Sequence, residues 1–111
     1  MYSSKLLDVI EKSRHVGQRY NASHVEDQLI EEMAELTQAL IKFRRATGHG
    51  CHTPVSQQDA IDGVIEETAD VIVCLSQLTG NFSNHQIRQV IEITGRKINR
   101  QLERYYSDGE N

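Results

Sequence analysis

The chain has 111 residues, a length that fits one domain, and its 38% hydrophobic and 25% charged residues are typical of a globular protein rather than a disordered one. Its formal net charge of −4 argues against nucleic acid as a partner, because nucleic-acid binding depends on a basic surface. The same charge allows small phosphorylated ligands, since a metal ion can bridge acidic side chains to phosphate. Aromatic residues make up only 5%, so the core has to be aliphatic.

The cysteines and the apolar runs of the sequence indicate the cellular compartment that we expect for this protein. Cys51 and Cys74 are the only cysteines and lie far apart, so a disulfide framework is not expected and a reducing compartment is the simpler interpretation. The first residues, MYSSKLLDVIEKSRH, lack the continuous apolar stretch of a signal peptide. The densest apolar run, from Val71 to Leu75, is too short to span a bilayer. We therefore expect a cytoplasmic protein with no membrane partner.

The first half of the chain predicts two helices. A periodic apolar pattern over residues 4–15 indicates the first. The second is predicted over 23–45, where Ser23 and Glu26 have the spacing of a capping box. The apolar residues of this second helix share one face at helical spacing: Leu29, Met33, Leu36 and Leu40.

The next segment combines loop and helix signals. Residues 46–55, ATGHGCHTPV, hold two glycines and the only proline and are predicted to form a loop. Ser56 and Asp59 then suit the start of a third helix, which is predicted to end near Leu78. Its apolar face is predicted to comprise Val64, Val71, Leu75 and Leu78.

The chain ends in a fourth predicted helix, over residues 84–105, with Ser83 and Gln86 as its capping box. Residues 106–111 are predicted to be a frayed C-terminal tail. No segment shows sustained two-residue alternation, so the fold class is all-α, a four-helix bundle-like single domain over residues 1–105. Small helical domains expose much apolar surface, so we expect a homo-oligomer, a homodimer or homotetramer, to complete the fold.

Acidic residues gather in two windows. Ten of the sixteen lie in residues 26–35 and 59–70. Because residues three apart share a helix face, two pairs are predicted to project together. These pairs are Glu32 with Glu35 on the second helix and Glu67 with Asp70 on the third. Glu67 falls within the apolar stripe of its helix, and Glu32 and Asp70 flank the edges of theirs, so we expect both pairs to face inward.

Inward carboxylates repel one another and lose hydration, so something must compensate their charge. A hard divalent cation does so, because it prefers oxygen ligands and tolerates retained water. Neither of the two acidic windows, residues 26–35 and 59–70, contains His or Cys, which disfavours zinc. The expected cofactor is Mg²⁺, with Mn²⁺ as a substitute. The alternative is that these acids form solvated helix faces that pair with Lys or Arg.

The two acidic segments, IEEMAELTQAL at residues 30–40 and EETADVIVCL at residues 66–75, carry a family resemblance. The pattern Glu-Glu-x-x-Glu followed on the next helix by Glu-x-x-Asp resembles the MazG-like nucleoside triphosphate pyrophosphohydrolases. This branch belongs to the all-α NTP pyrophosphatase superfamily, which also includes dimeric dUTPases and phosphoribosyl-ATP pyrophosphohydrolase. The resemblance spans roughly residues 24–104. Thirty-one residues separate Glu35 from Glu67, which is long for the family, and the glycine-containing loop accommodates the excess.

The resemblance implies a hydrolase acting on phosphoric anhydride bonds, a nucleotide diphosphatase that converts a nucleoside triphosphate to the monophosphate and pyrophosphate with Mg²⁺. Its role in nucleotide metabolism would be housecleaning of the nucleotide pool. By position, the metal ligands would be Glu32, Glu35, Glu67 and Asp70. Glu31 and Glu32 would be catalytic, and Glu31 would orient or deprotonate the attacking water.

The fourth predicted helix also carries a basic stripe of Lys97, Arg100 and Arg104, at three- and four-residue spacing. These side chains are candidates for binding the phosphates of the substrate and the departing pyrophosphate. The alternative is a solvated or subunit-facing basic surface.

Two alternative functions also agree with the sequence. The first is a dedicated enzyme for dUTP, dCTP or phosphoribosyl-ATP. The second is a non-catalytic helical oligomer that binds nucleotide or metal as a sensor, and it would show Mg²⁺-dependent binding without turnover.

Overall fold

The computed structural model describes residues 2–109, which form four helices and no strand. They are α1 (Tyr2–Gly17), α2 (Ala22–Ala46), α3 (Gln57–Thr79) and α4 (Asn84–Gly109). The predicted all-α, four-helix class is confirmed. Across residues 2–109, no helix combines the length and the apolar character that crossing a membrane requires.

The predicted starts of the last two helices are confirmed by their capping hydrogen bonds. The Ser56 hydroxyl accepts from the Asp59 N–H at 3.1 Å and caps α3. Before α4, the Ser83 hydroxyl accepts from the Gln86 N–H at 3.1 Å, and the Gln86 side-chain oxygen accepts from the Ser83 N–H at 2.9 Å. Two of the otherwise unpaired backbone donors are thus satisfied reciprocally, as in a capping box.

The predicted cap of α2 at Ser23 is wrong. The Asn21 side chain accepts from the His24 N–H at 2.8 Å, so the helix begins at Ala22 and Ser23 already lies inside its first turn. Asn caps a helix as well as Ser does, and the extended backbone of Asn21 (φ −71°, ψ 156°) suits the position. Ser and Asn compete as caps over this short stretch, and sequence spacing alone does not separate them.

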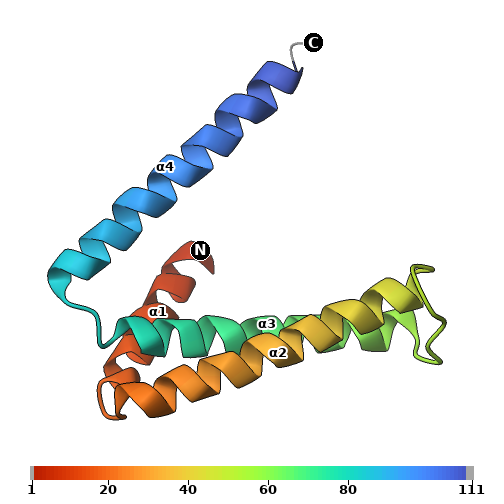
Figure 1. Cartoon of the computed structure of the whole chain (residues 1–111), viewed down its shortest axis with the longest axis horizontal. Coiled ribbons are helices and arrows are strands. Elements are labelled where there is room, and N and C mark those ends of the chain that lie inside the picture. The colour runs from red at the N-terminus through yellow and green to blue at the C-terminus, as the bar shows by residue number, and fades with distance from the viewer. Residues whose placement is uncertain (1, 110–111) are drawn as a thin grey trace. The chain divides into compact units, whose positions relative to one another are not determined.

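The chain divides into two compact units, one ending at Asn81 and the other beginning at Phe82. In the first unit, α2 and α3 lie side by side and antiparallel, and α1 packs against α3 (Figure 1). The second unit contains α4, which continues as helix through residues 106–109 of the predicted tail.

Two glycines allow α1 to approach α3 closely. A Cβ atom on Gly17 would overlap the backbone carbonyl of Gln77, and one on Gly80 would overlap the backbone carbonyl of Arg14. The Arg14 guanidinium also donates to the Thr79 carbonyl at 3.4 Å, at the C-terminal end of α3. Only glycine therefore fits where these helix ends meet.

The core of the described chain is small and aliphatic. Its buried apolar residues are Val25, Leu29, Ala39, Ala60 and Cys74. Several members of the predicted apolar faces are exposed instead, among them Met33 (46%), Leu40 (46%) and Leu75 (48%). Helical periodicity places these residues on the apolar face of their helix, as predicted. They are exposed because two helices packed side by side cover only a narrow strip of that face.

Candidate metal centre

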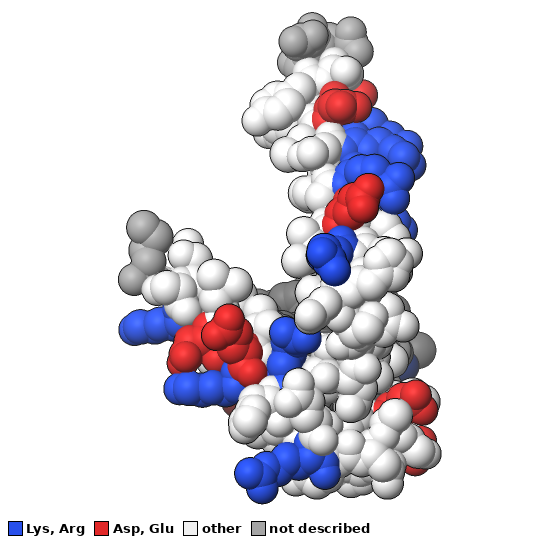
Figure 2. Space-filling model, turned by 90° about the vertical axis from the view of Figure 1, so that its left-hand side faces the viewer, with Lys and Arg blue, Asp and Glu red and all other residues white. Residues whose placement is uncertain are grey.

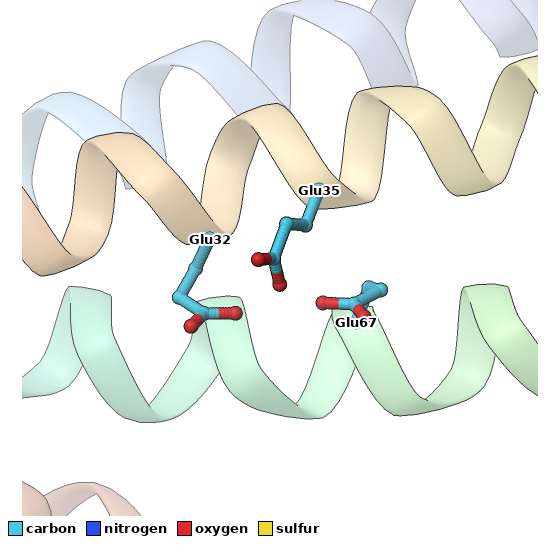
Figure 3. Close-up of side chains that lie close together, drawn as sticks. All are labelled: Glu32, Glu35 and Glu67. Atoms are coloured by element: carbon cyan, nitrogen blue, oxygen red, sulfur yellow. The ribbon is translucent and has the colours of Figure 1, made fainter.

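Three glutamate side chains from two helices converge in the middle of the α2–α3 pair. Glu32 and Glu35 project from α2 toward α3, and Glu67 projects from α3 toward them (Figure 3). One carboxylate oxygen from each lies within 4.8 Å of the other two. Glu32 and Glu35 are three residues apart and so share a helix face, and the antiparallel pairing brings Glu67 opposite them. We call these three residues the acidic cluster.

Two carboxylate oxygens of the acidic cluster are shielded from solvent without a partner. The Oε2 atoms of Glu32 and Glu67 are buried, and neither has a hydrogen-bond donor. Within residues 2–109 the only ion pair joins Lys12 to Asp8 on α1, so no Lys or Arg forms an ion pair with the acidic cluster. Shielded carboxylate oxygens without a donor are unfavourable unless a proton or a cation satisfies them.

The local electrostatics favour a positive ligand. Loss of hydration raises the pKa of Glu32 above its ordinary value, and the negative charges of Glu35 and Asp70 raise it further. The pKa of Glu67 is also raised, first by lost hydration and then by the charges of Glu35 and Asp70. The neighbouring carboxylates thus make Glu32 and Glu67 harder to ionise, and a divalent cation would relieve this repulsion.

The structure places the other predicted metal ligand and catalytic residue beside the acidic cluster rather than in it. Asp70 is exposed on α3, one turn after Glu67, and it is not among the three converging carboxylates. Its charge nevertheless raises the pKa of Glu32, Glu67 and Cys74, so it lies within electrostatic reach. Glu31 is exposed, and its charge contributes to the raised pKa of Glu32.

The predicted phosphate-binding residues lie on α4, in the second unit. Lys97, Arg100 and Arg104 are all exposed. Figure 2 shows basic side chains gathered along α4, with acidic side chains among them. Within this helix the three residues follow one stripe, as their spacing predicts.

A cavity of about 460 Å³ adjoins the acidic cluster, and the sequence interpretation did not foresee it. Glu35 and Glu67 line one part of it, and Gln38 and Lys42 line it from the following turns of α2. The spacing of Glu35, Gln38 and Lys42 could have indicated that their side chains share one face of α2, because residues three and four apart lie on one helix face. That this face borders open space depends on how α2 and α3 are paired.

No family model matches the chain, and neither the curated proteins nor the solved structures include a significant match to it. Fold and site together define an all-α protein whose central helix pair presents three converging carboxylates.

Proposed function

We propose that this protein is a Mg²⁺-dependent nucleoside triphosphate pyrophosphohydrolase, which cleaves its substrate to a nucleoside monophosphate and pyrophosphate. The observation that supports this most strongly is the acidic cluster, in which two shielded oxygens lack a partner. The residues fit a hard cation, because all three donors are carboxylates and none of them is engaged by Lys or Arg. The sequence resemblance to MazG-like enzymes supplies the reaction class.

Glu32, Glu35 and Glu67 would hold Mg²⁺, and Asp70, within electrostatic reach, would add the fourth carboxylate. The bound ion would neutralise phosphate oxygens and lower the pKa of a water. Glu31 stands next to Glu32 at the exposed edge and would accept the proton of the attacking water. Water adds its oxygen to the α- or the β-phosphorus, the anhydride bond between these two phosphorus atoms breaks, and the group that is not attacked leaves with the bridging oxygen.

Lys97, Arg100 and Arg104 of the α4 stripe are the candidates for binding phosphate groups of the substrate and of the departing pyrophosphate. Exposed apolar side chains on the same helix support association between copies of the chain, and they include Val90, Ile91, Ile93, Ile98 and Leu102. A homodimer or homotetramer would cover this surface, and mass measured by light scattering after size exclusion tests it.

The test of the activity is release of pyrophosphate from a panel of dATP, dCTP, dGTP, dTTP, dUTP and phosphoribosyl-ATP, with and without Mg²⁺. We expect Mg²⁺-dependent release by the wild type and collapse of turnover in Glu67→Gln and Asp70→Asn. The matched control is Glu66→Gln, because Glu66 is the exposed neighbour of Glu67 on α3 and lies outside the acidic cluster. Arg100→Gln should raise KM while Mg²⁺ binding persists.

Each alternative has its own outcome in this assay. Activity on one nucleotide alone would indicate a dedicated enzyme. Mg²⁺-dependent nucleotide binding without any pyrophosphate would indicate the non-catalytic sensor. Full activity in both Glu67→Gln and Asp70→Asn would refute the ligand assignment.

A further inference from the structure

The cavity beside the acidic cluster extends along the α2–α3 pair toward the loop that joins the two helices. Its walls come from both helices and from Val55 in the loop, and its volume of about 460 Å³ lies within the range of small-molecule sites. The residues that line it beyond the acidic cluster are Gln38, Ala39, Lys42, Val55, Asp59, Ala60 and Gly63. Two of the cluster's own residues, Glu35 and Glu67, also line it, so a ligand held at the cluster can reach into the cavity.

Gly63 is the unusual residue of this wall. It lies in the second turn of α3, where glycine is less favourable than alanine. A Cβ atom built on Gly63 meets no atom within 4 Å, as at Gly95 on α4, whereas at Gly17 and Gly80 backbone occupies that space. Packing within the chain therefore does not account for this glycine. The open space beside it belongs to the cavity, whose wall also includes the small side chains of Ala39 and Ala60.

The charges of the lining indicate which part of a nucleotide fits there. Three carboxylates line the cavity, those of Glu35, Asp59 and Glu67, against the single ammonium group of Lys42. This balance disfavours a polyphosphate chain, which needs several cationic partners. It does allow an uncharged group. Gln38 offers both a hydrogen-bond donor and an acceptor, which suits the edge of a heterocyclic base.

We infer that the cavity over Gly63 binds the nucleoside end of a nucleotide whose phosphates lie at the acidic cluster, with the base on the glycine and alanine wall and Gln38 at its edge. This inference rests on the proposed function for the placement of the phosphates. It assigns the selection of the base to α2 and α3, and it gives Gly63 a role in admitting the ligand.

The test measures binding to the full-length chain with Mg²⁺ present, by calorimetry, for two probes. One probe is the nucleotide from the panel that the wild type binds most tightly. The other is inorganic tripolyphosphate, which has the phosphates without the nucleoside. Gly63→Leu should weaken nucleotide binding by about tenfold or more, equivalent to about 1.4 kcal/mol, and leave tripolyphosphate binding unchanged. Gly95→Leu is the matched control, because Gly95 also lies within a helix with no atom within 4 Å of a Cβ, but on α4.

The outcomes separate this inference from the proposed function. If Gly63→Leu weakens both probes equally, or neither, the cavity does not hold the nucleoside. If Gln38→Ala leaves the relative affinities of the five deoxynucleotides unchanged, its assignment to the base edge is wrong. If the wild type binds nucleotide without hydrolysing it, the proposed activity fails while the probe comparison still decides the inference. A wild type that binds neither probe overturns both.

Discussion

Replacing Glu67 with glutamine should change thermal stability in opposite directions with and without Mg²⁺. Without metal at neutral pH, the Glu67 carboxylate repels Glu35 and Asp70 and has a shielded oxygen without a donor. Glu67→Gln keeps the shape of the side chain and removes that charge, so the metal-free variant should melt above the wild type. With Mg²⁺ the order should reverse, because the variant has lost one of three converging carboxylates.

The size of the Mg²⁺ effect follows from linkage. At a Mg²⁺ concentration of about 100 times Kd, binding stabilises the folded wild type by about 2.7 kcal/mol. With an unfolding entropy of about 2.1 cal/mol/K per residue, this corresponds to a rise in Tm of about 12 °C for a chain of 111 residues. Loss of a group that merely orients a metal ligand weakens affinity about 10–100-fold, so we take roughly hundredfold for a direct ligand. At the same Mg²⁺ concentration the rise for Glu67→Gln should then be only about 2 °C.

Differential scanning calorimetry of the wild type, Glu67→Gln and Glu66→Gln, each with Mg²⁺ and with EDTA, measures these shifts. Glu66→Gln should behave as the wild type does, because Glu66 is exposed and outside the acidic cluster. The reasoning would be refuted by a Glu67→Gln variant that melts below the wild type in EDTA and keeps the full Mg²⁺ shift. Glu67 would then be a structural residue rather than a ligand.

Two further predictions concern stability. The unfolding free energy of the metal-free protein should fall as pH rises above about 4.5, because the raised pKa values of Glu32 and Glu67 keep protons on the folded state that the unfolded state has already released. Urea melts across pH 4–8 measure this, saturating Mg²⁺ should remove most of the fall, and a stability that rises over this range would contradict it. Gly17→Ala should destabilise the chain by about 1–3 kcal/mol, because its methyl group overlaps the backbone of Gln77. Gly95→Ala should instead stabilise it by up to about 1 kcal/mol, and equal shifts in the two variants would show that α1 does not approach α3 so closely.

Local signals in the sequence were sufficient to predict the four helices and the inward orientation of Glu32 and Glu67. Hydrophobic period and capping residues predicted all four helices, and Glu67 was predicted to face inward because it interrupts an apolar stripe. The buried Oε2 atoms of Glu32 and Glu67 agree with that orientation. These features depend on residues within a few turns of one another, where helix geometry fixes the spacing.

The features that the sequence did not predict depend on how helices pair. The exposure of Met33 reflects the narrow contact between α2 and α3. The cavity over Gly63 and the position of Asp70 outside the acidic cluster depend on the relative register of these two helices. Helical periodicity gives the face of a residue but not the partner that it meets, so spacing could suggest four ligands where the structure brings three together.

The two cysteines differ in a way that makes the chain easy to label at one position. Burial and the charges of Glu32 and Asp70 raise the pKa of the Cys74 thiol, and only the thiolate reacts readily with alkylating reagents. Cys51 is exposed in the loop between α2 and α3. A maleimide fluorophore added to the native protein should therefore attach at Cys51 alone. No substitution would be needed to place a reporter at the end of the helix pair that the cavity approaches, where its emission could follow ligand entry in real time.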